Sequence, residues 1–126
     1  MQFDPGKAIY AQIAERIVDN ILSEKWPEEE RIPAVRELAV SLEVNPNTVV
    51  RAYNYLQEQE LIYNQRGIGY FVAPDGRARA KDMKRREFLD KELPYFFKNL
   101  VLLDIDMKEI ERRFEEFKQG GGNNEN

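Results

Sequence analysis

The stretch that decides the fold is Val44-Asn45-Pro46-Asn47-Thr48-Val49-Val50-Arg51-Ala52-Tyr53-Asn54-Tyr55-Leu56-Gln57-Glu58. Asparagine is a good N-cap and proline is favoured at the first helical position, so a helix is predicted to begin at Pro46. Apolar residues at three- and four-residue steps predict a buried side made of Val49, Ala52, Tyr53 and Leu56. The opposite side presents small polar groups and one cation, namely Asn47, Thr48, Arg51 and Asn54.

Two further helices are predicted upstream of this one. Between Ala8 and Lys25, isoleucines recur every four positions, which predicts an amphipathic helix. The Trp26-Pro27 pair and residues 28–30, three glutamates, end it in a segment expected to be a solvated loop. Residues 34–42 then form a short helix whose apolar residues share one face. Two short helices joined by a tight turn, the second presenting small polar groups, are typical of a helix-turn-helix.

A β-hairpin is predicted directly after the helix-turn-helix. Residues 61–64 and 69–72 are rich in β-branched and aromatic side chains, and residues 65–68 separate them. Gly67 and Gly69 allow the backbone to turn and to approach another surface closely. A hairpin at this place is the wing of a winged helix.

The C-terminal part is predicted to be helical and separate. Residues 74–76 mark a boundary, and residues 77–86 are basic, with six cations and one acid. The next helix should be kinked at Pro94, and the last should run from a capping box of Asp106 and Glu109 to Gln119. The predicted fold is therefore mostly α with a small β-hairpin: a winged helix-turn-helix domain over residues 1–74, a helical dimerisation segment of two helices over 75–119 and a disordered tail over 120–126.

Composition narrows the functional classes. The chain has 126 residues with neither cysteine nor histidine, which removes disulfides, thiolate nucleophiles, imidazole bases and the usual zinc ligand sets. We therefore expect no enzyme, no metal and no cofactor. The absence of a signal peptide and of a long apolar run leads us to expect a cytoplasmic protein. Residues 1–76 carry 7 Lys and Arg against 12 Asp and Glu, so any DNA binding must use a few well-placed cations.

Four segments together resemble the GntR family of bacterial transcription regulators, in particular its short YtrA-like branch. They are Ile9-Tyr10-Ala11-Gln12-Ile13, Ile32-Pro33-Ala34-Val35-Arg36-Glu37-Leu38-Ala39, residues 44–53, and Arg66-Gly67-Ile68-Gly69-Tyr70-Phe71-Val72. Ala34 stands where the family often has serine, and Glu60 replaces the usual glycine after the recognition helix. We expect Glu60 to adopt a left-handed conformation or to alter the helix end.

The resemblance and the helix-turn-helix geometry together assign candidate DNA-binding residues. Arg36 stands where the matching arginine of the family contacts DNA. The recognition helix of a helix-turn-helix points its first turns into the major groove. The wing can reach the minor groove or backbone phosphates. The candidates are Arg36, Asn45, Asn47, Thr48, Arg51, Arg66, Gly67 and Gly69. Structural alternatives remain: an ion pair for Arg36 or Arg51, a capping role for Thr48, and a tight turn that needs glycine anyway.

The C-terminal helices carry an apolar stripe that two short helices cannot bury by themselves. Packing against a second copy is the simplest solution, with Leu89, Leu93, Phe96, Phe97, Leu100 and Val101 as the dimerisation residues. We therefore expect a homodimer that binds double-stranded DNA at a pseudo-palindromic operator and acts as a repressor. A small-molecule effector between the C-terminal helices is compatible with the sequence. The competing interpretation is a protein-interaction module without specific DNA binding, and the basic residues 77–86 either touch flanking phosphates or are solvated.

Overall fold

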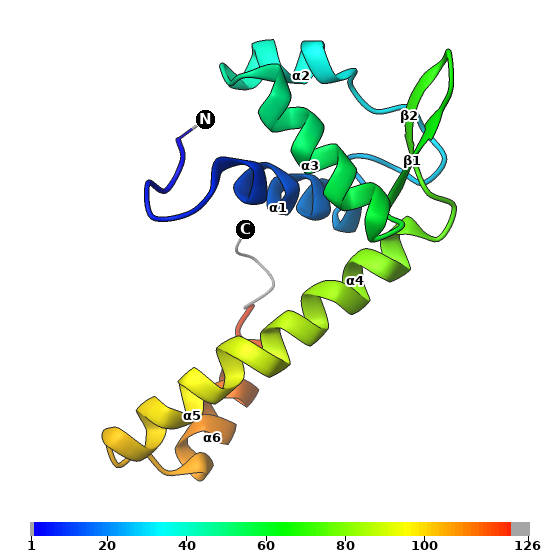
Figure 1. The fold of residues 1–126 in the computed structure, drawn as a ribbon. Helices are drawn as coiled ribbons and strands as arrows, with labels where there is room; N and C mark the ends of the chain where they lie inside the picture. Colours follow the sequence, from blue (N-terminus) through cyan, green and yellow to red (C-terminus); the bar gives the residue numbers. More distant parts are fainter. Residues whose placement is uncertain (1, 122–126) are drawn as a thin grey trace. The chain divides into compact units, whose positions relative to one another are not determined.

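The computed structural model describes residues 2–121 and divides the chain into two compact units, residues 1–84 and 85–126 (Figure 1). The first unit contains α1 (Ile9–Leu22), α2 (Val35–Leu42), α3 (Pro46–Glu58), β1 (Ile62–Gln65), β2 (Gly69–Val72) and most of α4 (Gly76–Glu87). A π-helical turn (Phe88–Glu92), α5 (Leu93–Leu102) and α6 (Met107–Gln119) belong to the second. Of the predicted disordered tail, residues 122–126 lie outside the described residues.

Helix α3 has the limits that its capping signals predict. It begins at Pro46, and the Asn45 Oδ1 accepts a hydrogen bond from the Asn47 backbone N–H at 2.8 Å. After the helix, Glu60 has a φ of 61°, which confirms the left-handed conformation expected where glycine is usual. The hydrogen bonds of Leu61 N–H to Leu56 O and of Glu60 N–H to Gln57 O close a Schellman motif.

The core of the first unit lies where α1 and α2 pack against α3. The predicted inner side of α3 is fully buried, and α1 contributes five residues of its own face. The buried set is Ile13, Ala14, Ile17, Val18, Ile21, Val49, Ala52, Tyr53 and Leu56. Helix α1 ends at Leu22 rather than at Lys25, because Glu24 takes up a left-handed conformation with a φ of 65°.

A short segment around Arg31 pairs with β2, which the sequence did not predict. Strands β1 and β2 pair antiparallel with Ile62 opposite Val72, as expected of the hairpin. In addition, the Ile32 N–H donates to Tyr70 O at 2.9 Å, the Val72 N–H donates to Glu30 O at 3.1 Å, and Arg31 bridges to Phe71. Residues 28–30 form the expected loop with exposed side chains, and the backbone of Glu29 and Glu30 in addition pairs with β2.

One side chain joins α3 to both of its neighbours. Tyr53 is fully buried, and its hydroxyl donates a 2.6 Å hydrogen bond to the carbonyl oxygen of Pro33, just before α2. Its ring meets Tyr70 of β2 edge-on, with 4.8 Å between the centroids. Burial raises the pKa of the Tyr53 phenol well above its ordinary value of 10.0, and Tyr70 and Glu37 raise it further. The phenol is thus held as a neutral donor.

The first compact unit extends beyond residue 74 because α4 packs on its core. Gly76 and Ala80 are buried and Met83 packs against the same core. A Cβ atom on Gly76 would lie 2.9 Å from Val72 Cγ1 and 3.0 Å from Leu61 O, so only glycine allows this close approach. The compact unit consequently ends at Lys84, inside α4, although the Pro74-Asp75-Gly76 sequence indicates a boundary.

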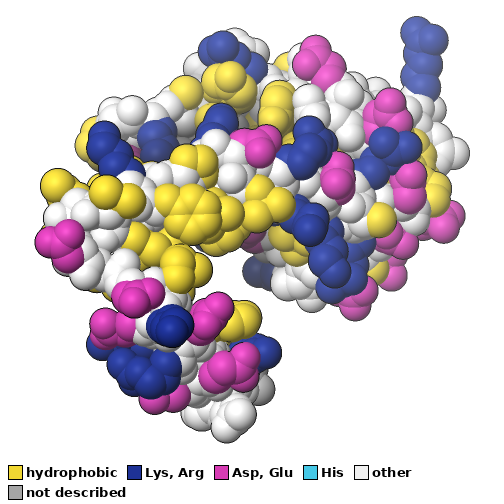
Figure 2. Space-filling model, turned by 90° about the horizontal axis from the view of Figure 1, so that it is seen from below, with side chains coloured by type: hydrophobic (Ala, Val, Ile, Leu, Met, Phe, Trp, Pro, Cys, Tyr) yellow, Lys and Arg dark blue, Asp and Glu magenta, His cyan; other side chains and the backbone are white. Residues whose placement is uncertain are grey.

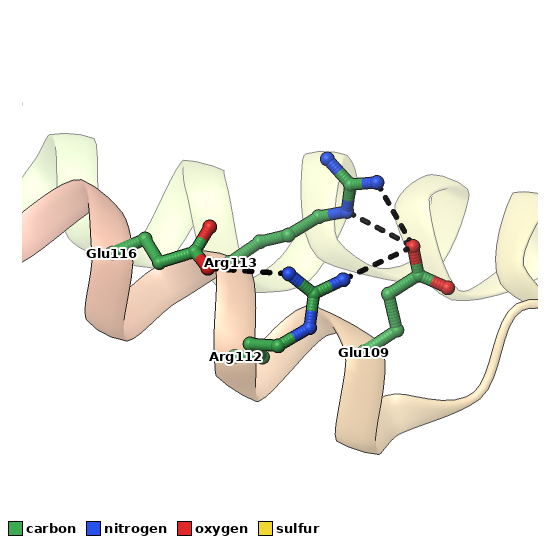
Figure 3. Close-up of polar contacts among 4 residues, drawn as sticks. All are labelled: Glu109, Arg112, Arg113 and Glu116. Atoms are coloured by element: carbon green, nitrogen blue, oxygen red, sulfur yellow. Dashed lines mark hydrogen bonds and ion pairs between the residues drawn. The ribbon is translucent and has the colours of Figure 1, made fainter.

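The second unit contains the predicted helices with two local differences. The irregular turn occupies residues 88–92, just before Pro94, because proline lacks an N–H and its ring clashes with the preceding turn. Asp106 caps α6 through the Lys108 N–H at 3.1 Å, but the Glu109 carboxylate binds arginines instead of completing a capping box. The α6 ion pairs join Glu109 and Glu116 to Arg112 and Arg113, with the shortest at 2.9 Å (Figure 3).

Three large apolar residues of α6 are exposed in the single chain. Met107, Phe114 and Phe117 keep 48%, 56% and 59% of their surface accessible. No α6 residue is buried. Within residues 2–121, no helix has both the length and the apolar composition to cross a lipid bilayer.

Replacing Tyr53 by phenylalanine should lower the free energy of unfolding by about 1–2 kcal/mol, because the Pro33 carbonyl loses its donor.

The raised pKa of Tyr53 also predicts that the stability depends on pH. Above pH 10 the unfolded phenol ionises while the folded one stays protonated, so stability falls with pH by up to ~1.4 kcal/mol per unit.

Denaturant titrations between pH 7 and pH 11.5 measure both effects. Tyr53→Phe should remove this alkaline loss. Tyr55→Phe, on the same helix but 37% exposed, should keep the wild-type stability and the wild-type pH dependence. Equal alkaline slopes in the wild type and in Tyr53→Phe would contradict the assignment.

Candidate nucleic-acid interface

The predicted DNA-binding residues come from three elements at one side of the first unit. In Figure 1, α2, the first turn of α3 and the tip of the β1–β2 hairpin lie at the top, while α1 and the start of α4 lie below. Arg36 is on α2, and the residues from Asn45 to Arg51 are at the start of α3. Arg66, Gly67 and Gly69 are at the wing tip. In helix-turn-helix proteins the side that carries the start of the second helix is the one that docks on DNA.

The first turn of α3 divides its polar side chains between capping and solvent. Asn45 and Asn47 are exposed and Thr48 is half-buried. The cap is made by the Asn45 Oδ1, and within residues 2–121 the Thr48 hydroxyl forms no hydrogen bond that would complete it. The cap uses only the carbonyl oxygen of the Asn45 side chain, so its amide Nδ2 donates no hydrogen bond within residues 2–121.

Arg36 is an exposed cation in the first turn of α2. Within residues 2–121 it forms no ion pair, so the alternative of a surface pair with a glutamate is not what the structure has. The neighbouring Glu37 is occupied elsewhere, since its Oε1 accepts the Ala34 backbone N–H at 3.2 Å. That bond is one half of a capping box. The other half is missing, because alanine has no side-chain acceptor for the backbone N–H of Glu37.

Arg51 stacks on an aromatic ring of α1. Its guanidinium carbon lies 4.0 Å from the centre of the Tyr10 ring, and it forms no ion pair with the described residues. Stacking uses the face of the guanidinium and leaves the donors at its edge available for a planar acceptor. Sequence reasoning did not identify Tyr10 as a support for Arg51, because the contact joins residues 41 positions apart.

The wing tip has two glycines in different surroundings. Gly67 has a φ of 80° and open space around it, as the tight turn requires. Gly69 has a φ of 149°, and a Cβ there would lie only 2.8 Å from the Nε atom of Arg31. The space at Gly69 is thus taken by an arginine of the chain itself. Arg31 followed three glutamates in a segment interpreted as a loop, so no sequence signal marked it.

Several acidic residues of the first unit form ion pairs with the basic residues of α4. Arg77 contacts Glu24 at 3.4 Å, its backbone N–H binds Glu28, and its Nε donates to the last-turn carbonyl of Leu22 at 2.9 Å. Further pairs join Arg79 to Asp75 and Glu60, and Lys84 to Asp19 and Glu15. These contacts give Arg77, Arg79 and Lys84 an intramolecular role.

The extension of the first unit to Lys84 changes its net charge. Residues 1–84 carry 11 Lys and Arg against 13 Asp and Glu, a net charge of −2 instead of the −5 of residues 1–76. Between residues 26 and 76 the only cations are Arg31, Arg36, Arg51 and Arg66. In the described part of the chain, none of these four forms an ion pair. The cations on α2, on α3 and at the wing are therefore all unpaired, as are Lys7, Arg16, Lys25 and Lys81 elsewhere in the described part of this unit.

The family model for "Bacterial regulatory proteins, gntR family" matches residues 9–72, which contain the helix-turn-helix and the wing. The regulator YhcF of Bacillus subtilis is 31% identical over 122 residues, covering 95% of this chain and 98% of YhcF. The transcriptional repressor YtrA of the same organism is 33% identical over 79 residues, or 61% of each chain. These relatives are transcriptional regulators and not enzymes.

Solved structures lead to the same family. A GntR-family regulator from Bacteroides thetaiotaomicron is similar with a TM-score of 0.78 and 51% identity, covering 89% of this chain and 97% of that one. The AraR DNA-binding domain bound to operator ORR3 has a TM-score of 0.50 and 32% identity, covering 58% and 93%. The chain therefore belongs to the GntR family of bacterial regulatory proteins, in its YtrA-like branch, and has the DNA-binding fold with which GntR regulators bind their operators.

Proposed function

We propose that the protein is a repressor that binds a pseudo-palindromic operator as a homodimer. The observation that carries this proposal is that every arginine on α2, on α3 and at the wing lacks an ion pair within the described residues. A cation without an internal partner is available to a phosphate or a base edge at no cost in broken ion pairs. The operator-bound AraR domain and the repressor YtrA support the proposal by similarity.

The geometry assigns separate tasks to the three elements. Helix α3 enters the major groove with Asn47 and Thr48 at its leading end, where exposed backbone N–H groups also favour phosphate. Arg51, stacked on Tyr10, presents its donor edge to a guanine. Arg36 binds a phosphate or a guanine beside α3, and Arg66 with Gly67 follows the minor groove. Base contacts then specify sequence while phosphate contacts set the register.

The second unit supplies the dimer contact. Figure 2 shows hydrophobic side chains gathered in a broad patch at the left of the view, where α5 lies in Figure 1. Of the six predicted dimerisation residues, Leu89, Phe96, Phe97 and Val101 are 39–81% exposed. Leu93 is half-buried and Leu100 is only 7% exposed, so these two already pack within the single chain. A patch of this size is unfavourable in water and fits a second copy.

A two-fold dimer of this kind presents two copies of α3 to two half-sites of opposite orientation, so the operator is an inverted repeat. Bound at a promoter, the dimer excludes RNA polymerase by occupying the same DNA. The direct test is selection of bound duplexes from a random pool by the full-length protein. We expect an inverted repeat with half-sites separated by about one helical turn, roughly 34 Å.

Two outcomes of that selection would overturn parts of the proposal. Enrichment of a single, non-repeated site would contradict the dimer. Retention of no duplex at modest ionic strength would contradict DNA binding altogether and would favour a protein-interaction module.

Replacing Arg36 or Arg51 by alanine should each weaken binding to the selected operator by about 1–3 kcal/mol if the two side chains contact base edges. Fluorescence anisotropy with a labelled duplex measures the affinity. Arg16→Ala, which removes an exposed cation from α1, is the matched control and should bind like the wild type. If both interface variants also bind like the wild type, the two arginines do not read the operator.

Replacing Phe97 by glutamate should convert the dimer to monomers, because the change would bury a charge in the shared apolar patch. Phe97 is 45% exposed, so the single chain should still fold. Sedimentation velocity gives the association state, and circular dichroism checks the fold. Gln119→Glu introduces the same charge at the exposed end of α6 and should leave the dimer intact. An intact Phe97→Glu dimer would place the interface elsewhere.

A further inference from the structure

Arg31 is held on the wing by backbone hydrogen bonds on both sides. Glu30 O accepts the Val72 N–H at 3.1 Å, and the Ile32 N–H donates to Tyr70 O at 2.9 Å. Arg31 itself is paired with Phe71. Arg31 therefore lies in a short segment that pairs with the outer side of β2, and this pairing fixes the position of its backbone.

The Arg31 side chain lies on the outer face of this sheet. Residues directly opposite one another in a sheet share a face, so Arg31 shares a face with Phe71, and Phe71 shares it with Tyr63, its partner in β1. The rings of Tyr63 and Phe71 stack with 5.5 Å between their centroids. The core-facing residues, Ile32, Ile62 and Val72, occupy the other face. Arg31 thus points away from the core.

Gly69 provides the place where the guanidinium rests. A Cβ atom on Gly69 would lie 2.8 Å from Nε of Arg31 and 3.2 Å from both Cζ and Nη2. Real Cβ atoms do not approach other atoms so closely, so any other residue at position 69 would displace the guanidinium. The glycine therefore positions Arg31 at the base of the wing turn.

Arg31 has no anionic partner in the described part of the chain, although acids are close in sequence. It follows Glu28, Glu29 and Glu30, yet the Glu28 carboxylate binds the backbone of Arg77. Glu37 lines the same open hollow as Arg31, but its Oε1 accepts the Ala34 N–H. An exposed guanidinium that pairs with none of its neighbouring carboxylates is available to an external anion.

We propose that Arg31 is a further DNA contact, which binds a backbone phosphate beside the wing and is positioned for it by Gly69. This inference rests on the proposed function and deepens it. It also gives Gly69 a role different from direct approach to DNA: the glycine leaves room for an arginine, and the arginine meets the phosphate. Because a phosphate carries no base identity, the contact contributes equally at every sequence.

Replacing Arg31 by glutamine tests the proposal through the salt dependence of binding. Each phosphate contact contributes about −0.9 to the slope of log affinity against log salt. The slope for Arg31→Gln should therefore be shallower by about 0.9 per subunit, for the selected operator and for an unrelated duplex alike. Arg31→Lys keeps the charge and should keep the slope. Arg16→Gln, the matched control on α1, should keep both slope and affinity.

Gly69→Ala tests the positioning role. It should weaken binding in the wild-type background and have a clearly smaller effect in the Arg31→Ala background, because the atoms that the new Cβ would meet are absent there. The backbone strain of alanine at a φ of 149° is common to both backgrounds and cancels in the comparison. Thermal melts identify any loss of folding in either background, and only folded variants enter the comparison.

The outcomes separate this inference from the function on which it rests. A wild-type protein that binds no duplex overturns the proposed function. A wild-type slope in Arg31→Gln, with the wild type binding its operator, overturns only the phosphate contact. Loss of binding to the operator without loss on the unrelated duplex would make Arg31 a base-reading residue and would also overturn the assignment.

Discussion

The hydrogen bond from the buried Tyr53 hydroxyl to the Pro33 carbonyl is the contact on which the arrangement of the interface depends. Helix α2 has eight residues and each wing strand has four, so neither element is long enough to hold its own position. Tyr53 connects α3 to the segment before α2 through its hydroxyl and to β2 through its ring. One side chain thereby links the three elements that carry the candidate DNA contacts.

The charged residues of the first unit are also arranged by contacts between elements that are distant in sequence. Cations of α4 form ion pairs with Glu15 and Asp19 on α1, with Glu24 on the loop after it, and with Glu60 just after α3. Exposed ion pairs of this type contribute little stability, about 0–1 kcal/mol each. They occupy several carboxylates, while Arg31, Arg36, Arg51 and Arg66 form no ion pair within the described residues. A domain with a small negative net charge can thus present a local positive surface.

Much of the interface could be predicted because its signals are local. The Asn45-Pro46 start of α3, its buried side and the hairpin follow from residues within a few positions of one another. Arg51 and Tyr10, which stack, are 41 positions apart in the sequence. Arg31 and Gly69, whose close approach leaves no room for a Cβ atom, are 38 positions apart. Such contacts depend on how helices and strands pack, so no short sequence pattern reports them. The role of Arg77, Arg79 and Lys84 was open for the same reason.

The sequence by itself determined the type and order of the elements in the first 73 residues, because capping, periodicity and turn residues act over a few neighbouring positions. It also determined the family resemblance, through four motifs at the right spacing. Only the tertiary structure decided which cations are paired and which are available, that residues 29–32 complete the wing, and that the first compact unit reaches Lys84. Pairing and burial are properties of distances in space, and these distances arise only when the core of α1, α3 and α4 has closed.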